Sequence, residues 1–199
     1  KKKKNYFVGS SHPSSLNRIS KFPFAISSGS ASDVGNLVQP ALITAGQSSD
    51  THGYASGGQA MPTSGGTLSN IIQKFAFAAD GDATDVGNLT DPRGAASGTS
   101  SSVEGYTSGG ERSAKNVVDK FPFSSNANAT DVGDLTVARS STAGHSSGGH
   151  GHATGGDGGA PGYSPLYNVK DKFPFAAGGN AVDIGDMTST NAGHAGHEG

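Results

Sequence analysis

The chain has 199 residues, with 14 Lys and Arg against 16 Asp and Glu, so its formal net charge is −2. This near-neutral balance gives no general electrostatic field for binding nucleic acid. The chain has no cysteine, which excludes a disulfide framework and thiolate metal sites. It also has no uninterrupted apolar run of 18 or more residues, so the sequence predicts no insertion into a membrane.

Residues 1–4 are all lysine and lead into Asn5, Tyr6, Phe7, Val8 and Gly9. That stretch is too short for the apolar region of a signal peptide. We interpret the lysines as a solvated tail rather than as an arm that binds polyanions. A start without methionine fits a fragment of a longer protein, a processed chain or an expression product, and the sequence leaves these alternatives open.

Two phrases recur four times along the chain, each time in the same order. The first is Asn-x-x-x-Lys-Phe-x-Phe and contains the phenylalanine pairs Phe22 and Phe24, Phe75 and Phe77, Phe121 and Phe123, and Phe173 and Phe175. The second is Asp-Val/Ile-Gly-Asn/Asp-Leu/Met and begins at Asp33, Asp85, Asp131 and Asp183. The glycines of the second phrase are 52, 46 and 52 residues apart. Repeats of this length are typical of the blades of a propeller, stacked so that each unit buries the apolar face of its neighbour.

The sequence favours strands over helices, because the chain's 32 glycines, with proline and serine at short intervals, leave no long segment with helical apolar spacing. In an extended chain the two phenylalanines of each pair lie on one face. We expect them between successive units, where burying each one is worth about 1.5–3 kcal/mol. The four aspartates are expected to cap turns rather than to form calcium sites.

A third segment ends in a Gly-Gly pair and consists of small residues around one tyrosine, as in residues 51–58. We expect it to form a strand near a central axis, where small side chains let strands approach closely. The copies differ in length between this pair and the next phenylalanine phrase. Residues 59–69, 111–115 and 157–167 are therefore predicted to be irregular loops.

The two ends of the chain resemble the two halves of one unit. Ala195, Gly196 and His197 match Ala143, Gly144 and His145, and residues 5–10 can be aligned with residues 53–58. The sequence therefore predicts one all-β domain over residues 1–199, a propeller of about four units closed by strands from both termini. Two alternatives stay open, namely a segment cut from a longer array and two chains that combine into a larger ring.

Histidines are the one clustered set of side chains with metal-binding chemistry. His145, His150 and His152 lie close together with Asp157 nearby, which makes the three histidines weak candidates for a metal site. We favour a surface-loop explanation and predict neither metal nor cofactor. No Gly-x-Ser-x-Gly elbow or phosphate-binding loop occurs in the sequence. The chain is therefore predicted to be no enzyme, with no catalytic residues.

A strand ending in Gly-Gly, a variable loop, an aromatic strand, a turn, and a link containing Arg93 or Arg139 together resemble the kelch repeat. The resemblance covers nearly the whole chain in four copies, although the chain has no tryptophan and Val-Gly-Asn/Asp-Leu stands at the usual tryptophan position. It implies a kelch-like β-propeller.

The phrases Lys-Phe-Pro-Phe, Ala-Thr-Asp-Val-Gly-Asp-Leu-Thr and His-Gly-Tyr-Ala-Ser-Gly-Gly resemble degenerate kelch-type arrays of structural and tail-fibre proteins of marine phages, cyanophages among them. This resemblance implies an extracellular component of a virion surface or appendage, which assembles with other virion proteins or with its own copies, or recognises a host surface. The alternative is a lectin-like propeller whose loops bind host-surface glycans. A metal-dependent enzyme using the histidine cluster is the third interpretation.

Overall fold

The structure is a computed structural model, and it describes residues 4–8, 17–23, 29–60, 67–111 and 113–193. Within these ranges the chain forms 18 strands in five antiparallel sheets and no helix. The prediction of an all-β protein is confirmed.

Four of the sheets follow one another along the chain. A small fifth sheet is formed by short strands in the connecting segments. The first sheet has the order β1 (Lys4–Val8), β2 (Arg18–Pro23), β3 (Ser32–Asn36). The second has the order β10 (Thr84–Asn88), β9 (Ile71–Ala76), β6 (His52–Ser56), β5 (Ala45–Ser48). The third comprises β11 (Ser97–Ser100), β12 (Glu104–Ser108), β13 (Val117–Pro122) and β14 (Thr130–Asp134). The fourth comprises β15 (Ala143–Ser147), β16 (His150–Thr154), β17 (Val169–Pro174) and β18 (Val182–Asp186), and the small sheet comprises β4 (Ala41–Leu42), β7 (Gln59–Ala60) and β8 (Thr67–Leu68).

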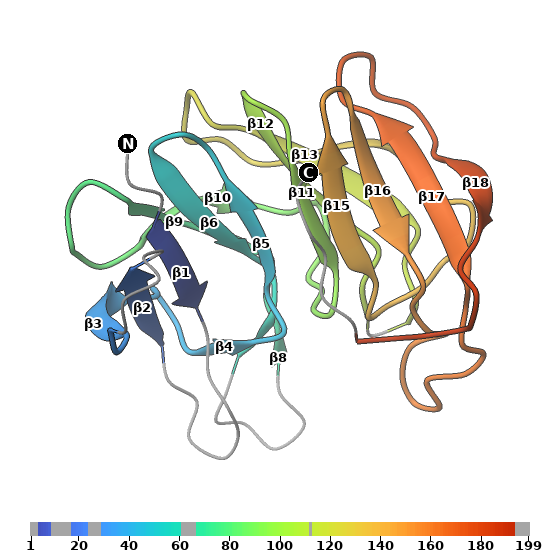
Figure 1. Cartoon of the computed structure of the whole chain (residues 1–199), viewed down its shortest axis with the longest axis horizontal. Helices are drawn as coiled ribbons and strands as arrows, with labels where there is room; N and C mark the ends of the chain where they lie inside the picture. Colours follow the sequence, from blue (N-terminus) through green and yellow to red (C-terminus); the bar gives the residue numbers. More distant parts are fainter. Residues whose placement is uncertain (1–3, 9–16, 24–28, 61–66, 112, 194–199) are drawn as a thin grey trace.

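The four main sheets stand side by side, and the first and fourth lie at opposite sides of the molecule (Figure 1). Strands β5, β11 and β15 each form one edge of their sheet, and β11 contacts both of the others. We call these three strands the inner strands. The hairpins that leave these strands lie at the upper end in Figure 1, and the longer connections lie at the lower end. Strand β1 pairs with β2 in the same way that β6 pairs with β9, so β1 corresponds to the second strand of the other sheets. Among the described residues, the first sheet therefore has no strand equivalent to β5.

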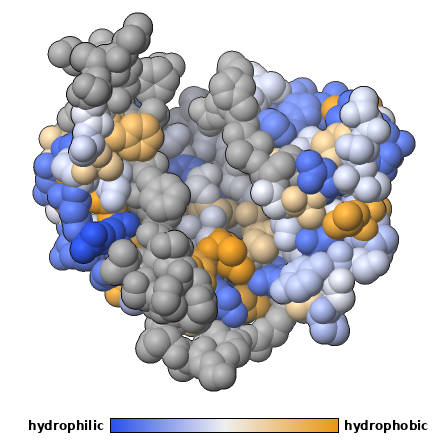
Figure 2. All heavy atoms as spheres, turned by 60° about the horizontal axis from the view of Figure 1, so that its bottom comes forward, coloured by the Kyte–Doolittle hydropathy of each residue, from blue (hydrophilic) through white to orange (hydrophobic). Residues whose placement is uncertain are grey.

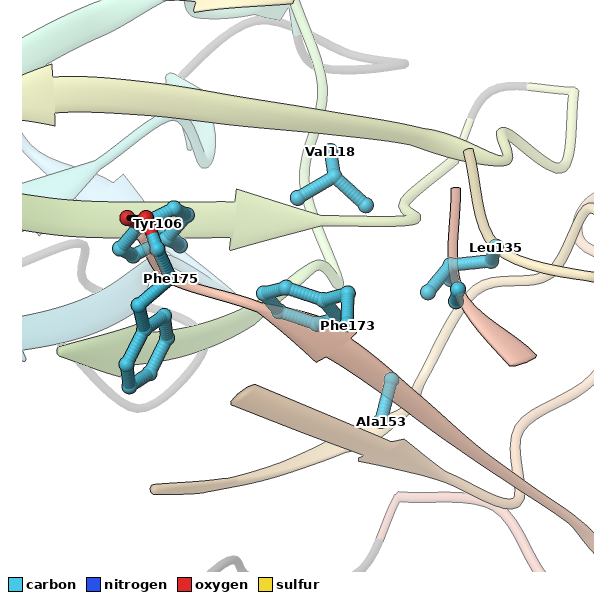
Figure 3. Close-up of a cluster of buried hydrophobic side chains, with 7 residues drawn as sticks. Tyr106, Val118, Leu135, Ala153, Phe173 and Phe175 are labelled. Atoms are coloured by element: carbon cyan, nitrogen blue, oxygen red, sulfur yellow. Dashed lines mark hydrogen bonds between the residues drawn. The ribbon is translucent and has the colours of Figure 1, made fainter. Parts of the chain in front are cut away.

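Phenylalanines fill the spaces between successive sheets. In the junction of the third and fourth sheets, Phe173 and Phe175 meet Tyr106, Val118 and Leu135 (Figure 3). The Tyr106 ring stacks on Phe175 with 4.6 Å between ring centroids, and its hydroxyl donates a 2.8 Å hydrogen bond to the Phe175 carbonyl.

The same cluster recurs at the two earlier junctions. Phe121 packs between the second and third sheets, and Phe75 packs between the first and second, each with its pair partner partly buried beside it. Phe22 is half-buried in the first sheet, and Phe24 lies outside the described residues.

The tyrosine-bearing stretch forms the second strand of its sheet, and the expectation that it lines the axis is wrong. Its glycines instead leave room for the phenylalanine rings. A Cβ at Gly53 would lie 2.3 Å from the ring of Phe75, and a Cβ at Gly105 would lie 2.4 Å from the ring of Phe121. Each ring thus lies directly over the glycine of the neighbouring strand.

Each repeated aspartate accepts a hydrogen bond from the backbone N–H of the glycine two residues later, at 2.8–3.3 Å. These aspartates therefore shape an irregularity inside each outer strand, β3, β10, β14 and β18, where the pairing register with the neighbouring strand shifts as in a β-bulge. The first three glycines also meet the next sheet, since a Cβ at Gly35 would lie 2.1 Å from the Gly81 carbonyl oxygen.

Glycines also set the spacing of the inner strands. A Cβ at Gly98 of β11 would lie 2.1 Å from the Gly46 carbonyl oxygen of β5, and one at Gly144 of β15 would lie 2.3 Å from the Gly98 carbonyl oxygen. The inner strands thus touch through their backbones. At Gly46 itself, a Cβ would meet no described atom within 4 Å.

We expect Gly98→Ala to lower the free energy of unfolding by about 1–3 kcal/mol, because its methyl group would collide with the backbone of β5. Urea unfolding monitored by circular dichroism measures this change. Gly46→Ala is the matched control and should leave the stability of the isolated chain nearly unchanged. Equal losses in the two variants would contradict the backbone contact.

Two buried ion pairs link the second sheet to the third and the third to the fourth. Arg93 Nη2 lies 2.6 Å from Asp119 Oδ2, and Arg139 Nη1 lies 3.0 Å from Asp171 Oδ2. All four side chains are fully buried. Each carboxylate also accepts bonds from the backbone and hydroxyl of a threonine, Thr90 or Thr136. Burial lowers the pKa of both arginines, and the paired aspartates oppose this shift.

The first junction replaces both members of this pair. Ala41 stands at the arginine position, and the fully buried Gln73 stands at the aspartate position. The Gln73 amide oxygen accepts a 2.6 Å bond from the Val38 N–H, which takes the place of the threonine contact. Because a lone buried charge is costly, the arginine and the aspartate are lost together.

We expect Asp171→Ala to destabilise the fold by about 3–5 kcal/mol, because it leaves the Arg139 guanidinium buried without a counter-ion. Arg18→Ala removes one partner of the half-exposed Arg18–Asp33 pair, 3.2 Å apart, and should cost less than about 1 kcal/mol. Chemical denaturation of both variants tests the comparison. A small loss for Asp171→Ala would mean that the pair does not hold the sheets together.

The predicted closure into a ring of about four units is not found among the described residues. Ala95 and Ser141 donate their N–H groups to the carbonyls of Ile43 and Ala95, and Gly193 donates to Ser141. Within the described ranges, no backbone hydrogen bond joins Ile43 to Gly193, so the row of hydrogen bonds does not close into a ring. The C-terminal residues 195–197 that were expected to close the ring lie outside the described residues.

Candidate functional site: a serine-lined pocket at the hairpin end

A pocket of about 750 Å³ opens where the hairpins of the second, third and fourth sheets meet. Its walls are residues 48–50, 100–104 and 146–149, together with Lys120, Phe175 and Ala176. This volume lies within the range of sites for small ligands. Serine predominates in all three hairpins, at Ser48, Ser49, Ser100, Ser101, Ser102, Ser146 and Ser147.

Serine side chains fix the shape of two of these hairpins. Ser49 and Ser101 occupy equivalent turn positions, and their hydroxyl oxygens accept bonds from the N–H groups of His52 and Glu104 at 3.1 and 3.0 Å. Their own N–H groups donate to the carbonyls of the same two residues, both at 2.9 Å. The turns are therefore closed in both directions.

Serines also tie one hairpin to the next. The Ser48 N–H donates to the Ser100 hydroxyl at 3.0 Å, and the Ser100 N–H donates to the Ser146 hydroxyl at 2.9 Å. The three walls thus form one hydrogen-bonded row across the inner strands.

Charged groups of the pocket lie at its third-sheet wall and at Asp50. Lys120 and Glu104 form an ion pair at 3.0 Å, and Glu104 also accepts a 2.9 Å bond from the Tyr106 hydroxyl, whose single proton it shares with the Phe175 carbonyl. Burial raises the pKa of Tyr106, and the hydrogen bond to Glu104 and its charge raise it further. Tyr106 therefore stays a neutral donor that joins this wall to the core.

This arrangement suits a neutral ligand with many hydroxyl groups. Serine hydroxyls both donate and accept hydrogen bonds, Lys120 donates, and Asp50 accepts. Phe175 and Ala176 add an apolar patch to the wall. The pocket can therefore hold a sugar by hydrogen bonds and apolar contact.

The variable loops to which the lectin-like alternative assigns the ligand do not line this pocket. Residues 59–69, 111–115 and 157–167 follow β6, β12 and β16, so they lie at the end opposite the pocket. The expectation of an irregular loop is wrong for part of residues 59–69, because β7 and β8 lie within this range and pair with each other. The end opposite the pocket faces forward in Figure 2, where hydrophobic side chains gather near the middle among hydrophilic ones. Residues 61–66 and 112 of these loops lie outside the described residues.

The histidine cluster is part of a hairpin in the fourth sheet. His145 and His152 are cross-strand partners, His145 contacts the Thr154 hydroxyl at 3.2 Å, and His152 contacts the Ser147 hydroxyl at 3.3 Å. Asp157 accepts bonds from the Ser140 hydroxyl and the Gly159 N–H. In the part of the chain that the structure describes, no three His, Asp or Glu side chains are grouped to hold a metal ion.

Partial burial lowers the pKa of His152 below its ordinary value of 6.5, and the positive charges of His145, His150 and Lys172 lower it further. The folded state therefore favours the neutral imidazole, and stability should fall as the pH drops below about 6.5, where the unfolded chain binds more protons. His52 shifts in the same direction through burial and Lys74.

We expect His152→Tyr to weaken this acid destabilisation, because tyrosine stands at the equivalent positions 54 and 106 and does not titrate there. Unfolding curves at pH 7.5 and 5.0 measure the difference, with the His52 contribution remaining in both proteins. An unchanged pH dependence in the variant would show that His152 does not contribute.

Comparisons with known proteins identify a fold and no family. No family model matches the chain, and no curated protein matches it. A solved structure titled "Structure of YjhT" superposes with a TM-score of 0.70 at 10% sequence identity and covers 88% of this chain. The chain spans 61% of that protein's length. At this identity the similarity concerns the fold alone.

The described residues contain no helix that could cross a membrane.

Proposed function

We propose that the chain is a rigid, non-enzymatic module of four kelch-like propeller blades, which serves an extracellular virion surface or appendage in assembly or host-surface recognition. The four main sheets are the four blades. The proposal is supported by the sequence phrases shared with phage arrays and by the repeated residues, which serve blade packing.

One observation carries the recognition role, namely that three successive sheets bring serine-bearing hairpins to a single pocket. Many of its polar groups already fix the walls, since Ser49 and Ser101 close their turns and Ser100 and Ser146 tie the strands together. A pocket of fixed shape suits binding, because little ordering remains to be done when the ligand enters.

The test of the location is to purify the particles that carry this protein and to find the chain on them with a specific antibody by electron microscopy. Labelling of the particle surface or an appendage is the expected result. Recovery of the chain only among cytosolic proteins of the host would overturn the virion proposal.

A lectin-like role is the second candidate, and the hydroxyl-lined pocket is the observation that favours it. The ligand class would be a neutral glycan of a host surface. Binding to immobilised glycans tests this role, and a signal no higher than that of a chain unfolded in urea would exclude it.

For any glycan that binds, we expect Lys120→Met to weaken the affinity about 10-fold or more, because a hydrogen bond to a charged group contributes roughly 1.5–3 kcal/mol. Lys74→Met is the matched control, since Lys74 holds the equivalent position in the second sheet and bonds Asn126 outside the pocket. Isothermal titration calorimetry gives both affinities. Equal effects of the two variants would place the ligand elsewhere.

A further inference from the structure

The third sheet departs from the repeat at the hairpin end, where the pocket lies. Thr51 and His52 follow the turn of the second-sheet hairpin, and Val103 and Glu104 stand at the same positions in the third sheet. Val103 and Glu104 line the pocket, whereas Thr51 and His52 do not. The repeat alone therefore does not explain this wall of the pocket.

The lysine of the third sheet also makes a different contact from its counterparts. Lys21 pairs with Asp80 on the loop of the next sheet, and Lys74 donates a 2.7 Å bond to Asn126 in the same way. In the fourth sheet Gly178 stands at this loop position and offers no side chain. Lys120 pairs instead with Glu104 of its own sheet at 3.0 Å. The charged pair therefore stays at the pocket and does not seal the junction to the fourth sheet.

This ion pair keeps free capacity for hydrogen bonds. Glu104 uses one carboxylate oxygen for Lys120 and the other for the Tyr106 hydroxyl. Each oxygen has a second lone pair, and the ammonium group has further N–H groups. Because Glu104 balances the charge of Lys120 and Asp50 adds a negative charge, the pocket does not select an anion. It can both accept from and donate to the hydroxyl groups of a neutral sugar.

Val103 places an exposed apolar side chain beside this pair. Its carbonyl accepts a 2.9 Å bond from the Phe123 N–H, and the carbonyls of Thr51 and Gly149 accept the equivalent bonds in the neighbouring sheets. Since threonine, valine and glycine all serve, the hairpin needs only the backbone at this position. The side chain of Val103 is nevertheless 62% exposed at the pocket. It is therefore available to contact a ligand.

A second apolar group comes from the fourth sheet. The Phe175 carbonyl accepts a 2.8 Å bond from the Tyr106 hydroxyl, which holds this segment near Glu104. The next residue, Ala176, is exposed and lines the pocket. Phe175 is the one aromatic residue of the described pocket lining, and its ring is packed into the junction with only 6% exposed (Figure 3). The apolar surface offered to a ligand is therefore aliphatic and small, which suits a methyl group better than the flat face of a sugar ring.

The fourth-sheet hairpin leaves this side of the pocket open. A Cβ at Gly148 or Gly149 would meet no described atom within 4 Å, and neither glycine has a φ in the left-handed region. Packing and backbone conformation therefore do not require glycine here. The missing side chains leave space opposite Val103 through which a ligand can enter.

We infer that the ligand of this pocket is a neutral sugar that carries a methyl group. The methyl group lies against Val103 and Ala176, and the hydroxyl groups meet the Glu104–Lys120 pair and the hairpin serines. The inference rests on the lectin-like role proposed above and names its ligand more closely. Two kinds of sugar supply such a methyl group, namely 6-deoxyhexoses and N-acetylated hexosamines.

Pairs of sugars that differ at the methyl group test the inference on the full chain. L-Fucose has a methyl group where L-galactose has a hydroxymethyl group, and N-acetylglucosamine has one methyl group more than N-formylglucosamine. We expect the methyl-bearing member of at least one pair to bind about 5-fold more tightly, because its methyl group leaves water for an apolar wall. Isothermal titration calorimetry gives the ratio of affinities, and the pair that shows the preference identifies the kind of sugar.

Val103→Thr tests the wall, because Thr51 shows that this hairpin position accommodates threonine. The variant should bring the ratio of affinities close to 1 without a loss of stability in urea unfolding. Val38→Thr is the matched control, since Val38 is 48% exposed but does not line the pocket, and it should keep the ratio. A preference that survives in Val103→Thr would overturn the inference.

The remaining outcomes separate the inference from the role on which it rests. Equal affinities within both pairs would overturn the methyl contact and leave the lectin-like role standing. If none of the four sugars binds, the inference is wrong, and the binding of the chain to immobilised glycans decides whether the lectin-like role falls with it.

Discussion

The contact of a phenylalanine pair with the aromatic and aliphatic face of the preceding sheet is the interaction on which the structure depends. Each sheet is a thin layer, and Phe75, Phe121 and Phe173 become buried only because another sheet stands in front of them. The glycines under these rings, such as Gly53, let the aromatic layer lie flat on its own sheet. Each sheet has two different faces, one that carries the phenylalanines and one that receives the phenylalanines of the next sheet. The order in which the sheets pack is therefore set by the pairing of these two faces.

The buried ion pairs add specificity to this apolar contact. An aliphatic side chain fits many positions, whereas Arg139 must find Asp171 or remain buried as a lone charge. The first junction shows the same rule in its neutral form, with Ala41 and Gln73. At every described junction, the polar pair between the sheets is therefore matched, and the apolar side chains pack around it. This match holds neighbouring sheets in the relative position that brings their hairpins together at the pocket.

Much of the fold could be predicted from sequence because its strongest residues are periodic. The phenylalanine phrases mark β2, β9, β13 and β17, and the Asp-x-Gly phrases mark the outer strands. The inner strands escaped prediction because a stretch such as Ala45–Ser48 has no apolar alternation, and its glycine is needed only when a neighbouring backbone is present. The pocket escaped because its serines come from three segments about 50 residues apart and look like ordinary turn residues until the hairpins meet.

Both faces of a junction are encoded in one stretch of roughly 50 residues, a length typical of kelch units. Duplicating such a stretch in the gene yields a sheet that already fits its neighbours on either side, so an array can lengthen or shorten by whole units without inventing a contact. A cut inside a unit has a different result, because it strands half of a sheet. Such a protein therefore evolves more easily by whole units than by fractions of a unit. Individual copies can diverge in their connections, and the two sides of a junction change together, as Ala41 and Gln73 show.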